Sequence, residues 1–123
     1  MQSGIFIPAG PIDQPSFTYC HREEWSIDAL REMLNGAFVE GINLGLGQFM
    51  YVDEDGQQNN LPINGIASAL YHRRRGGNVI VGNALVLGVD RNGENCSVSH
   101  DTVLLVAKIA TAMTTEGNLN ELA

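Results

Sequence analysis

Apolar residues recur at helical intervals just after residue 25. The four residues that would share one face are Ile27, Leu30, Met33 and Leu34. Ser26 precedes them, and a serine hydroxyl readily accepts a hydrogen bond from an unpaired N–H of the first helical turn. Asn35-Gly36 follows them, and glycine commonly ends a helix because it adopts the left-handed conformation. The pattern predicts a helix between Ser26 and Asn35.

Two β-rich runs come next, over residues 37–44 and 48–52. The linker Gly45-Leu46-Gly47 turns freely, so we expect the two runs to form a hairpin. Asp53-Glu54-Asp55-Gly56 has the composition of a turn, and residues 57–60 read as a polar loop.

Leu61-Pro62 introduces a second helix, predicted over residues 64–73 and ended by Gly76-Gly77. A β-rich run over residues 78–87 follows, interrupted by Gly82-Asn83. Glycine inside a strand marks a bulge or a place where another backbone or a ligand comes close.

The two ends of the chain complete the pattern. Residues 5–9 form a short apolar run that Pro8 places at a strand end or a sheet edge. Ser99 is the expected N-cap of a last helix over residues 101–113, which is apolar around most of its circumference and therefore well buried or docked on a partner. Residues 114–123 are expected to be a frayed tail.

The whole chain, residues 1–123, is predicted to be one α+β domain with a mainly antiparallel sheet and two to three helices.

Charge removes several classes of function. The chain of 123 residues has a net charge of −7, and general nucleic-acid binding or docking on an anionic membrane needs a basic surface. The N-terminus lacks the pattern of a signal peptide, and no apolar run has the length of a membrane span. Cys20 and Cys96 suit a reducing cytoplasm as free thiols, with one disulfide as the alternative. We expect a soluble cytoplasmic protein.

Arg73, Arg74 and Arg75 are three of the seven cationic residues of the chain. Guanidinium groups match phosphate geometry, so the run is a candidate clamp for an anion. Cations at the end of a helix also offset its dipole, and this simpler interpretation is the favoured one. Successive helical residues point in different directions, so one or two of the three arginines at most would grip one ligand.

Two asparagines are further candidates for binding a ligand. Asn64 lies where it would cap the second helix, which is the favoured interpretation, or hydrogen-bond a ligand. Asn83 lies in a β-rich run that asparagine does not favour, so it is either a ligand contact or part of an edge bulge.

Metal and catalytic motifs do not emerge from the spacing. The acidic turns at Asp53 and at Asp90 both place the wrong residue at the glycine position of a calcium loop. His21, His72 and His100 lack a second ligand at zinc spacing. We therefore expect no metal, no cofactor and no catalytic residue.

Three segments together resemble a known family. Tyr51-Val-Asp-Glu-Asp-Gly56 is followed by Leu61-Pro-Ile-Asn64 with Ala67 three residues later, and then by the apolar run from Ile80 to Leu87 with an internal glycine. This order is similar to that of a family of small bacterial and bacteriophage proteins described only as a domain of unknown function. The similarity covers residues 24–95. It implies a phage or mobile-element setting in a bacterial host cell, and it implies no catalytic residues.

Three functions follow as hypotheses. The first is a non-enzymatic accessory protein that binds a host or phage protein, or a small anionic ligand such as a nucleotide, with counter-defence as one role that fits the setting. The second is a small enzyme acting on a nucleotide or modified base, for which the sequence offers no cluster of acid, base and nucleophile. The third is a structural homo-oligomer, motivated by the apolar last helix.

Overall fold

The computed structural model describes residues 1–10, 15–36 and 38–122 of the chain. In chain order its elements are β1 (Gln2–Ile7), β2 (Thr18–Arg22), α1 (Ile27–Leu34), β3 (Val39–Gly45), β4 (Gln48–Asp53), α2 (Gly65–Arg75), β5 (Ala84–Val89), β6 (Asn95–Cys96) and α3 (His100–Leu122). Every pair of neighbouring strands is antiparallel. The predicted α+β domain is confirmed.

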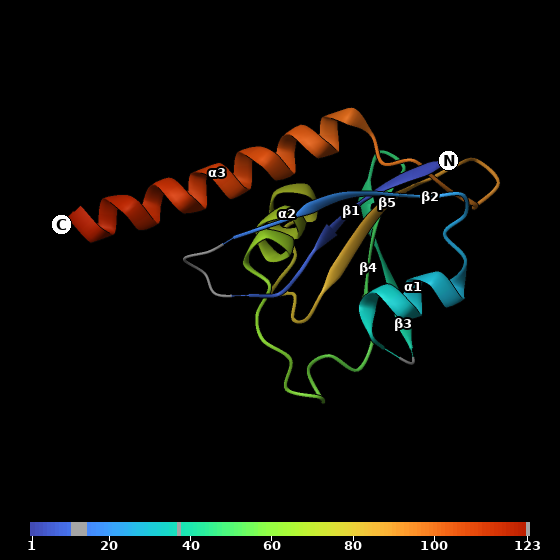
Figure 1. Cartoon of the computed structure of the whole chain (residues 1–123), viewed down its shortest axis with the longest axis horizontal. Helices are drawn as coiled ribbons and strands as arrows, with labels where there is room; N and C mark the ends of the chain where they lie inside the picture. The colour runs from blue at the N-terminus through green and yellow to red at the C-terminus, as the bar shows by residue number, and fades with distance from the viewer. Residues whose placement is uncertain (11–14, 37, 123) are drawn as a thin grey trace.

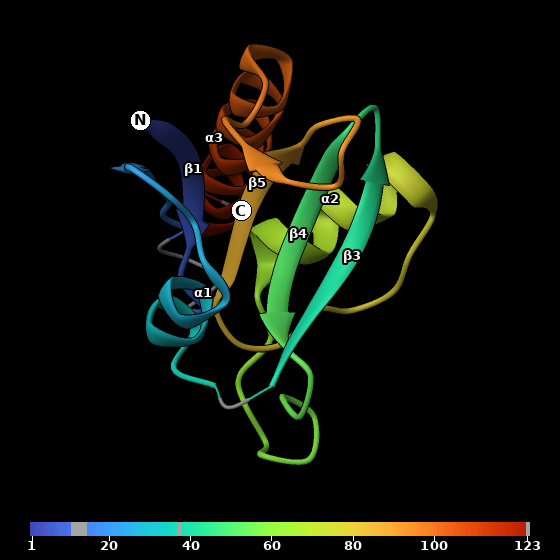
Figure 2. The same ribbon diagram turned by 90° about the vertical axis from the view of Figure 1, so that its right-hand side faces the viewer.

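The sheet separates two layers of helix (Figures 1 and 2). Its strand order is β2-β1-β5-β4-β3, and the short β6 pairs with the end of β5. Ala84 and Val86 of β5 pack into a core with α2 and α3, whereas Leu85 and Leu87 pack against α1. The central strand is thus buried on both faces, which explains why its sequence is almost continuously apolar.

Helix α1 forms as its sequence predicts. The Ser26 hydroxyl accepts a hydrogen bond from the N–H of Ala29 at 3.2 Å, and Asn35 ends the helix in the left-handed conformation. Trp25 precedes the cap, is buried, and joins Leu30 in the core beneath α1. This is the hydrophobic-staple arrangement, which fixes the direction in which the chain enters the helix.

The predicted β3–β4 hairpin is confirmed, with Leu46-Gly47 as its two-residue turn. Both turn residues have positive φ values, 56° for Leu46 and 73° for Gly47. This combination belongs to a type I′ turn, whose twist matches that of the flanking strands. Leu46 is 88% exposed, so it occupies a strained backbone conformation without burying its side chain.

The interruption predicted at Gly82-Asn83 is confirmed, but residues 78–81 do not form the first half of a strand, and Val81 forms only an isolated antiparallel bridge with Ile63. Strand β5 begins only at Ala84, and the segment before it is fastened to the chain that enters α2. The Asn64 N–H donates to the Ile80 carbonyl at 2.8 Å, and the Gly82 N–H donates to the Pro62 carbonyl at 2.7 Å. These hydrogen bonds replace a strand ladder.

The ends of the chain differ from the prediction in two respects. Strand β1 begins at Gln2 and ends at Ile7, so Pro8 lies just beyond the strand end. The Ser99 hydroxyl caps α3 by accepting from the Thr102 N–H at 3.2 Å, as predicted, but the helix continues to Leu122 and extends past the sheet (Figure 1). The backbone is thus helical over residues 114–122, and fraying at this end of the chain stays a prediction. Residue 123 lies outside the described residues.

Within the described part of the chain, no helix combines the length and the apolar character that crossing a membrane requires.

Replacing Leu46 is expected to stabilise the protein. Leu46→Asn should raise the free energy of unfolding by about 1 kcal/mol, since asparagine tolerates the left-handed conformation that leucine resists. Leu46→Val is the matched control and should lower it, because a β-branched side chain fits this conformation worse still. Urea denaturation of the three proteins would measure the order Asn, Leu, Val, and any other order would contradict the turn geometry.

Candidate functional site

The three arginines lie at the C-terminal end of α2, but they do not converge. The Arg74 guanidinium donates to the buried Thr102 hydroxyl at 3.1 Å, and this hydroxyl also accepts from the Ser99 hydroxyl at the start of α3. Arg75 lies near Gly45 in the β3–β4 hairpin. Its Nη1 is 3.9 Å from the position that a Cβ atom would take if residue 45 were not a glycine. Arg73 is exposed. Arg74 therefore joins α2 to α3, and a clamp made of all three arginines is not formed.

The favoured interpretation of this run, a helix end, agrees with the geometry. Gly76 ends α2 in the left-handed conformation, and its N–H donates to the carbonyl of His72. The arginines thus lie at the negative end of the helix dipole, which they stabilise. A role for Arg73 or Arg75 toward an anion stays a prediction.

Asn64 caps α2 and does two further tasks. Its side-chain oxygen accepts from the Ala67 N–H at 3.1 Å, while its amide nitrogen donates to the carbonyls of Ile7 and Gly82 at 2.8 and 2.9 Å. It is 1% exposed. The capping interpretation is confirmed, and a ligand has no access to this side chain without opening the core.

The neighbours of Asn64 in the sequence pattern Leu61-Pro62-x-Asn64-x-x-Ala67 also serve the fold. The Leu61 side chain packs closely on Gly82. A Cβ atom at position 82 would lie 2.7 Å from Leu61 Cδ1. Ala67 is fully buried and supplies the N–H that Asn64 caps. The pattern therefore fixes how α2 joins the sheet, and it marks a structural junction.

Asn83 takes part in this junction. Its side-chain oxygen accepts from the N–H of Ala9 at 3.0 Å, so it holds the chain that leaves β1. It lies just before β5 and not within a strand, which corrects the prediction of a bulge. The expectation that another backbone comes close at Gly82-Asn83 is confirmed. A ligand contact by Asn83 stays a prediction.

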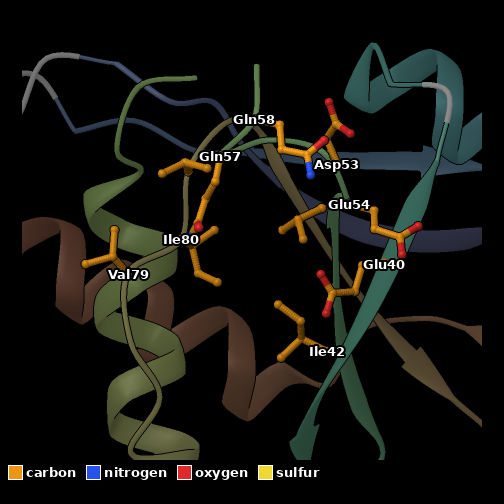
Figure 3. Close-up of a pocket in the computed structure, with 10 residues that line it drawn as sticks. Glu40, Ile42, Asp53, Glu54, Gln57, Gln58, Val79 and Ile80 are labelled. Atoms are coloured by element: carbon orange, nitrogen blue, oxygen red, sulfur yellow. The ribbon is translucent and has the colours of Figure 1, made fainter. Parts of the chain in front are cut away.

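A cleft of about 320 Å³ opens beside the sheet at another place, between β3 and the segment that follows α2 (Figure 3). Its walls are apolar: Ile42 and Val52 come from the sheet, and Val79, Ile80 and Val81 come from the facing segment. Its rim is polar and is made by Glu40, Asp53, Glu54, Gln57 and Gln58. The cleft thus combines a surface for an apolar stem with a negatively charged mouth.

The carboxylates of the cleft lack a cationic partner within the described chain. The ion pairs that the described residues form are Arg22–Glu32 at 3.8 Å and Arg31–Asp28 at 3.7 Å, both on the α1 side. Asp53 accepts a hydrogen bond from the N–H of Asp55 at 2.9 Å, which holds the turn as its sequence suggests. Glu40 and Glu54 are exposed. A cation that entered the cleft would meet uncompensated negative charge.

Sequence reasoning missed this site. The sequence predicts a turn at Asp53-Glu54-Asp55-Gly56 and a strand that contains Glu40, and neither prediction indicates a cleft. The cleft exists because Glu40 and Val79, which are 39 positions apart, face each other across it. The available signal was that residues 40–58 carry several acids and no lysine or arginine.

The arrangement offers little for catalysis. Cys20 and Cys96 are free thiols. Burial raises the pKa of Cys20, and burial followed by the charge of Asp90 raises the pKa of Cys96, whereas a nucleophilic thiol needs a lowered pKa. Asp53 lies in the cleft but Asn64 and Asn83 lie at the junction, so the three do not share a pocket. No group of three or more His, Cys, Asp or Glu within the described ranges is placed to hold a metal ion.

Comparison with known proteins identifies one family. The family model described as "Domain of unknown function (DUF3846)" matches residues 12–112. This match extends on both sides of the region over which the sequence motifs suggested such a family. No curated protein and no solved structure matches the chain.

Removing the Asn64 side chain should destabilise the fold strongly. Asn64→Ala loses a helix cap and leaves two buried carbonyls without a donor, so we expect a loss of about 3 kcal/mol in the free energy of unfolding. Asn59→Ala, in the exposed loop before the junction, is the control and should change it by less than about 0.5 kcal/mol. Chemical denaturation measures both, and equal stabilities would refute the role given to Asn64.

The arginines should differ from one another in their effect on stability. Arg74→Ala breaks a charged hydrogen bond to a buried hydroxyl and should lower the free energy of unfolding by about 1.5 kcal/mol. Arg73→Ala removes an exposed side chain and should leave it within about 0.5 kcal/mol. Thermal denaturation separates the two, and an unchanged melting temperature for Arg74→Ala would contradict the anchoring role.

Proposed function

The chain belongs to the DUF3846 family, and we propose that it acts by binding a partner protein, whose exposed lysine or arginine side chain enters the cleft beside β3. The observation that carries the proposal is the composition of this cleft. Aliphatic side chains line its walls, and Glu40, Asp53 and Glu54 surround its mouth. A basic side chain has the complementary form, since its apolar stem packs on the walls while its charged end meets the carboxylates.

Charge favours one of the two kinds of target that the sequence left open. A nucleotide or other small anion would be repelled from the cleft, and the arginines that would attract one do not converge. A protein with a basic patch is attracted both by the cleft and by the net charge of −7. The target we favour is therefore a protein.

The wider role belongs to the same proposal. The resemblance to bacterial and bacteriophage proteins supports an accessory protein of a phage or mobile element that binds a host protein in the bacterial cytoplasm. Counter-defence is one role that such binding would serve. Helix α3 gives less support to the oligomeric alternative, because Val106, Ile109 and Ala110 are already buried against the domain.

The first test uses the smallest ligand that carries the proposed chemistry. N-acetyl-arginine methylamide, titrated into the protein, should shift the backbone amide NMR signals of Glu40, Ile42 and Val79. The citrulline analogue, which has nearly the same shape without the charge, should bind at least tenfold more weakly. Added salt should weaken the arginine compound, because the mouth of the cleft is exposed to solvent.

Variants separate the cleft from the general acidity of the protein. Glu40→Gln with Glu54→Gln should abolish the shifts, whereas Glu23→Gln with Glu32→Gln removes the same net charge elsewhere and should preserve them. Shifts caused by ATP near Arg73 and Arg75, with none caused by the arginine compound, would overturn the proposal in favour of an anionic ligand.

A further inference from the structure

Strand β3 forms one edge of the sheet, and no other strand among the described residues pairs with its outer side. The Glu54 N–H donates to the Phe38 carbonyl at 3.0 Å, which identifies Phe38 and Glu54 as a hydrogen-bonded pair. Hydrogen-bonded and non-hydrogen-bonded pairs alternate along an antiparallel ladder. The register of β3 with β4 then gives the direction of each backbone group in β3. The N–H and C=O groups of Glu40 and Ile42 hydrogen-bond to β4. Those of Val39, Gly41 and Asn43 point outward, away from β4.

This edge carries no lysine or proline, and its inward-pointing charge, Glu40, would be neutralised by a basic residue of an added strand. Natural edge strands carry lysine, proline or inward-pointing charge that blocks a further strand. The sequence Val39-Glu-Gly-Ile-Asn-Leu-Gly45 contains neither lysine nor proline, and its register shift comes only after Asn43. An extended segment therefore has three residues of open backbone on which to pair.

The acidic cleft lies alongside this edge. Glu40 and Ile42, whose backbones bond inward, point their side chains into the cleft, with Val79 on the opposite wall (Figure 3). A strand added beside β3 would place every second side chain on the same face of the sheet. Those side chains would reach the mouth of the cleft, so backbone pairing and side-chain recognition would act together.

The charges along the edge change sign. Glu40, Asp53 and Glu54 lie near its beginning, whereas Arg75 lies against Gly45 at its end. Glu40 and Gly45 are five positions apart along the strand, which is about 17 Å. A basic residue of the added segment is therefore favoured at one end of the edge only.

We propose that β3 is a docking edge for an extended segment of a partner protein, which pairs with Val39, Gly41 and Asn43 as an additional strand. Its lysine or arginine enters the cleft beside Glu40, and an apolar residue two positions away packs on Ile42. This inference rests on the proposed function, because it assigns the basic side chain to the same cleft. Binding of this kind draws affinity from main-chain hydrogen bonds and specificity from alternate side chains.

A second copy of the chain fits the edge poorly. Strand β3 has no basic residue, so pairing two β3 strands would bring the Glu40 carboxylates of both copies together with no cation between them. Charge complementarity instead selects a basic segment of a different protein.

The experiment begins with selection from a displayed library of random 12-residue peptides on the full-length protein. Enriched peptides should share a lysine or arginine with an apolar residue two positions away. A synthetic peptide with the enriched sequence should lose at least tenfold in affinity with the Glu40→Gln, Glu54→Gln protein, but not with the Glu23→Gln, Glu32→Gln control.

Backbone pairing is tested on the peptide, which leaves the protein intact. Methylating its amide nitrogens one at a time should weaken binding at least tenfold at every second position and little at the positions between. Hydrogen exchange of the Gly41 and Asn43 amides should slow in the complex. On the protein, Gly41→Pro removes one outward N–H and should weaken binding, whereas Gly41→Ala retains this group and should bind as the wild type does.

The outcomes distinguish the two proposals. In one outcome, peptide binding depends on Glu40 and Glu54 but methylation weakens it equally at every position. This outcome would support the proposed function of the cleft and overturn the docking edge. Periodic sensitivity to methylation without any dependence on these acids would overturn the basic-segment proposal and the cleft function together. Failure to enrich any peptide, or dimerisation of the protein through β3 in light scattering, would overturn the docking edge.

Discussion

The fold depends on one buried amide, the side chain of Asn64. Its oxygen caps α2, and its nitrogen donates to the carbonyl at the end of β1 and to the carbonyl of Gly82, two residues before β5. Three segments that are far apart in the sequence are therefore joined at one side chain with almost no exposure to solvent. Each buried carbonyl would be costly without its donor, so this contact holds the helix layer in register with the sheet.

The role of Asn64 shows which parts of the family motif concern folding. Leu61, Asn64, Ala67 and Gly82 interact with one another and are described by packing and hydrogen bonds alone. Arg74 likewise serves the fold, because its hydrogen bond to Thr102 joins α2 to α3. The residues with no structural task at the surface of the cleft, Glu40 and Glu54, are the ones that give it its charge. The exposed acids of the cleft and the residues that hold the fold together thus lie in different parts of the molecule.

The cleft and the open edge both exist because the sheet ends at β3. The segment after α2 is held to the entrance of that helix by Ile80 and Gly82, so it lies opposite β3 and does not extend the sheet. In the described part of the chain the sheet accordingly stops at β3, with no strand on its outer side and a hollow beneath. A partner strand that occupied this position would complete the sheet and cover the hollow in one step.

Local sequence determined the elements whose causes are local. The caps at Ser26 and Ser99 act within a few residues and were predicted from their neighbours. The helix stop was predicted at Asn35-Gly36 and the hairpin turn at Gly45-Leu46-Gly47, and the structure places the left-handed residue at Asn35 and the two-residue turn at Leu46-Gly47. The α+β class followed from these elements and from the β-rich runs between them. The sequence also determined the net charge of −7, which disfavours general nucleic-acid binding.

Only the tertiary structure decided where β5 begins, what Arg74 contacts and which acids face a cleft. Residues 78–83 are as apolar as a strand, yet their backbone bonds to residues 62–64, which no pattern within the run reveals. The three arginines are adjacent in sequence, but the elements packed around α2 send them to different partners. The cleft needs β3 opposite a segment 39 positions later, and such a contact arises from the path of the whole chain. Hydrogen bonds and contacts over these separations depend on the packing of the layers, so they lie beyond the reach of local propensity.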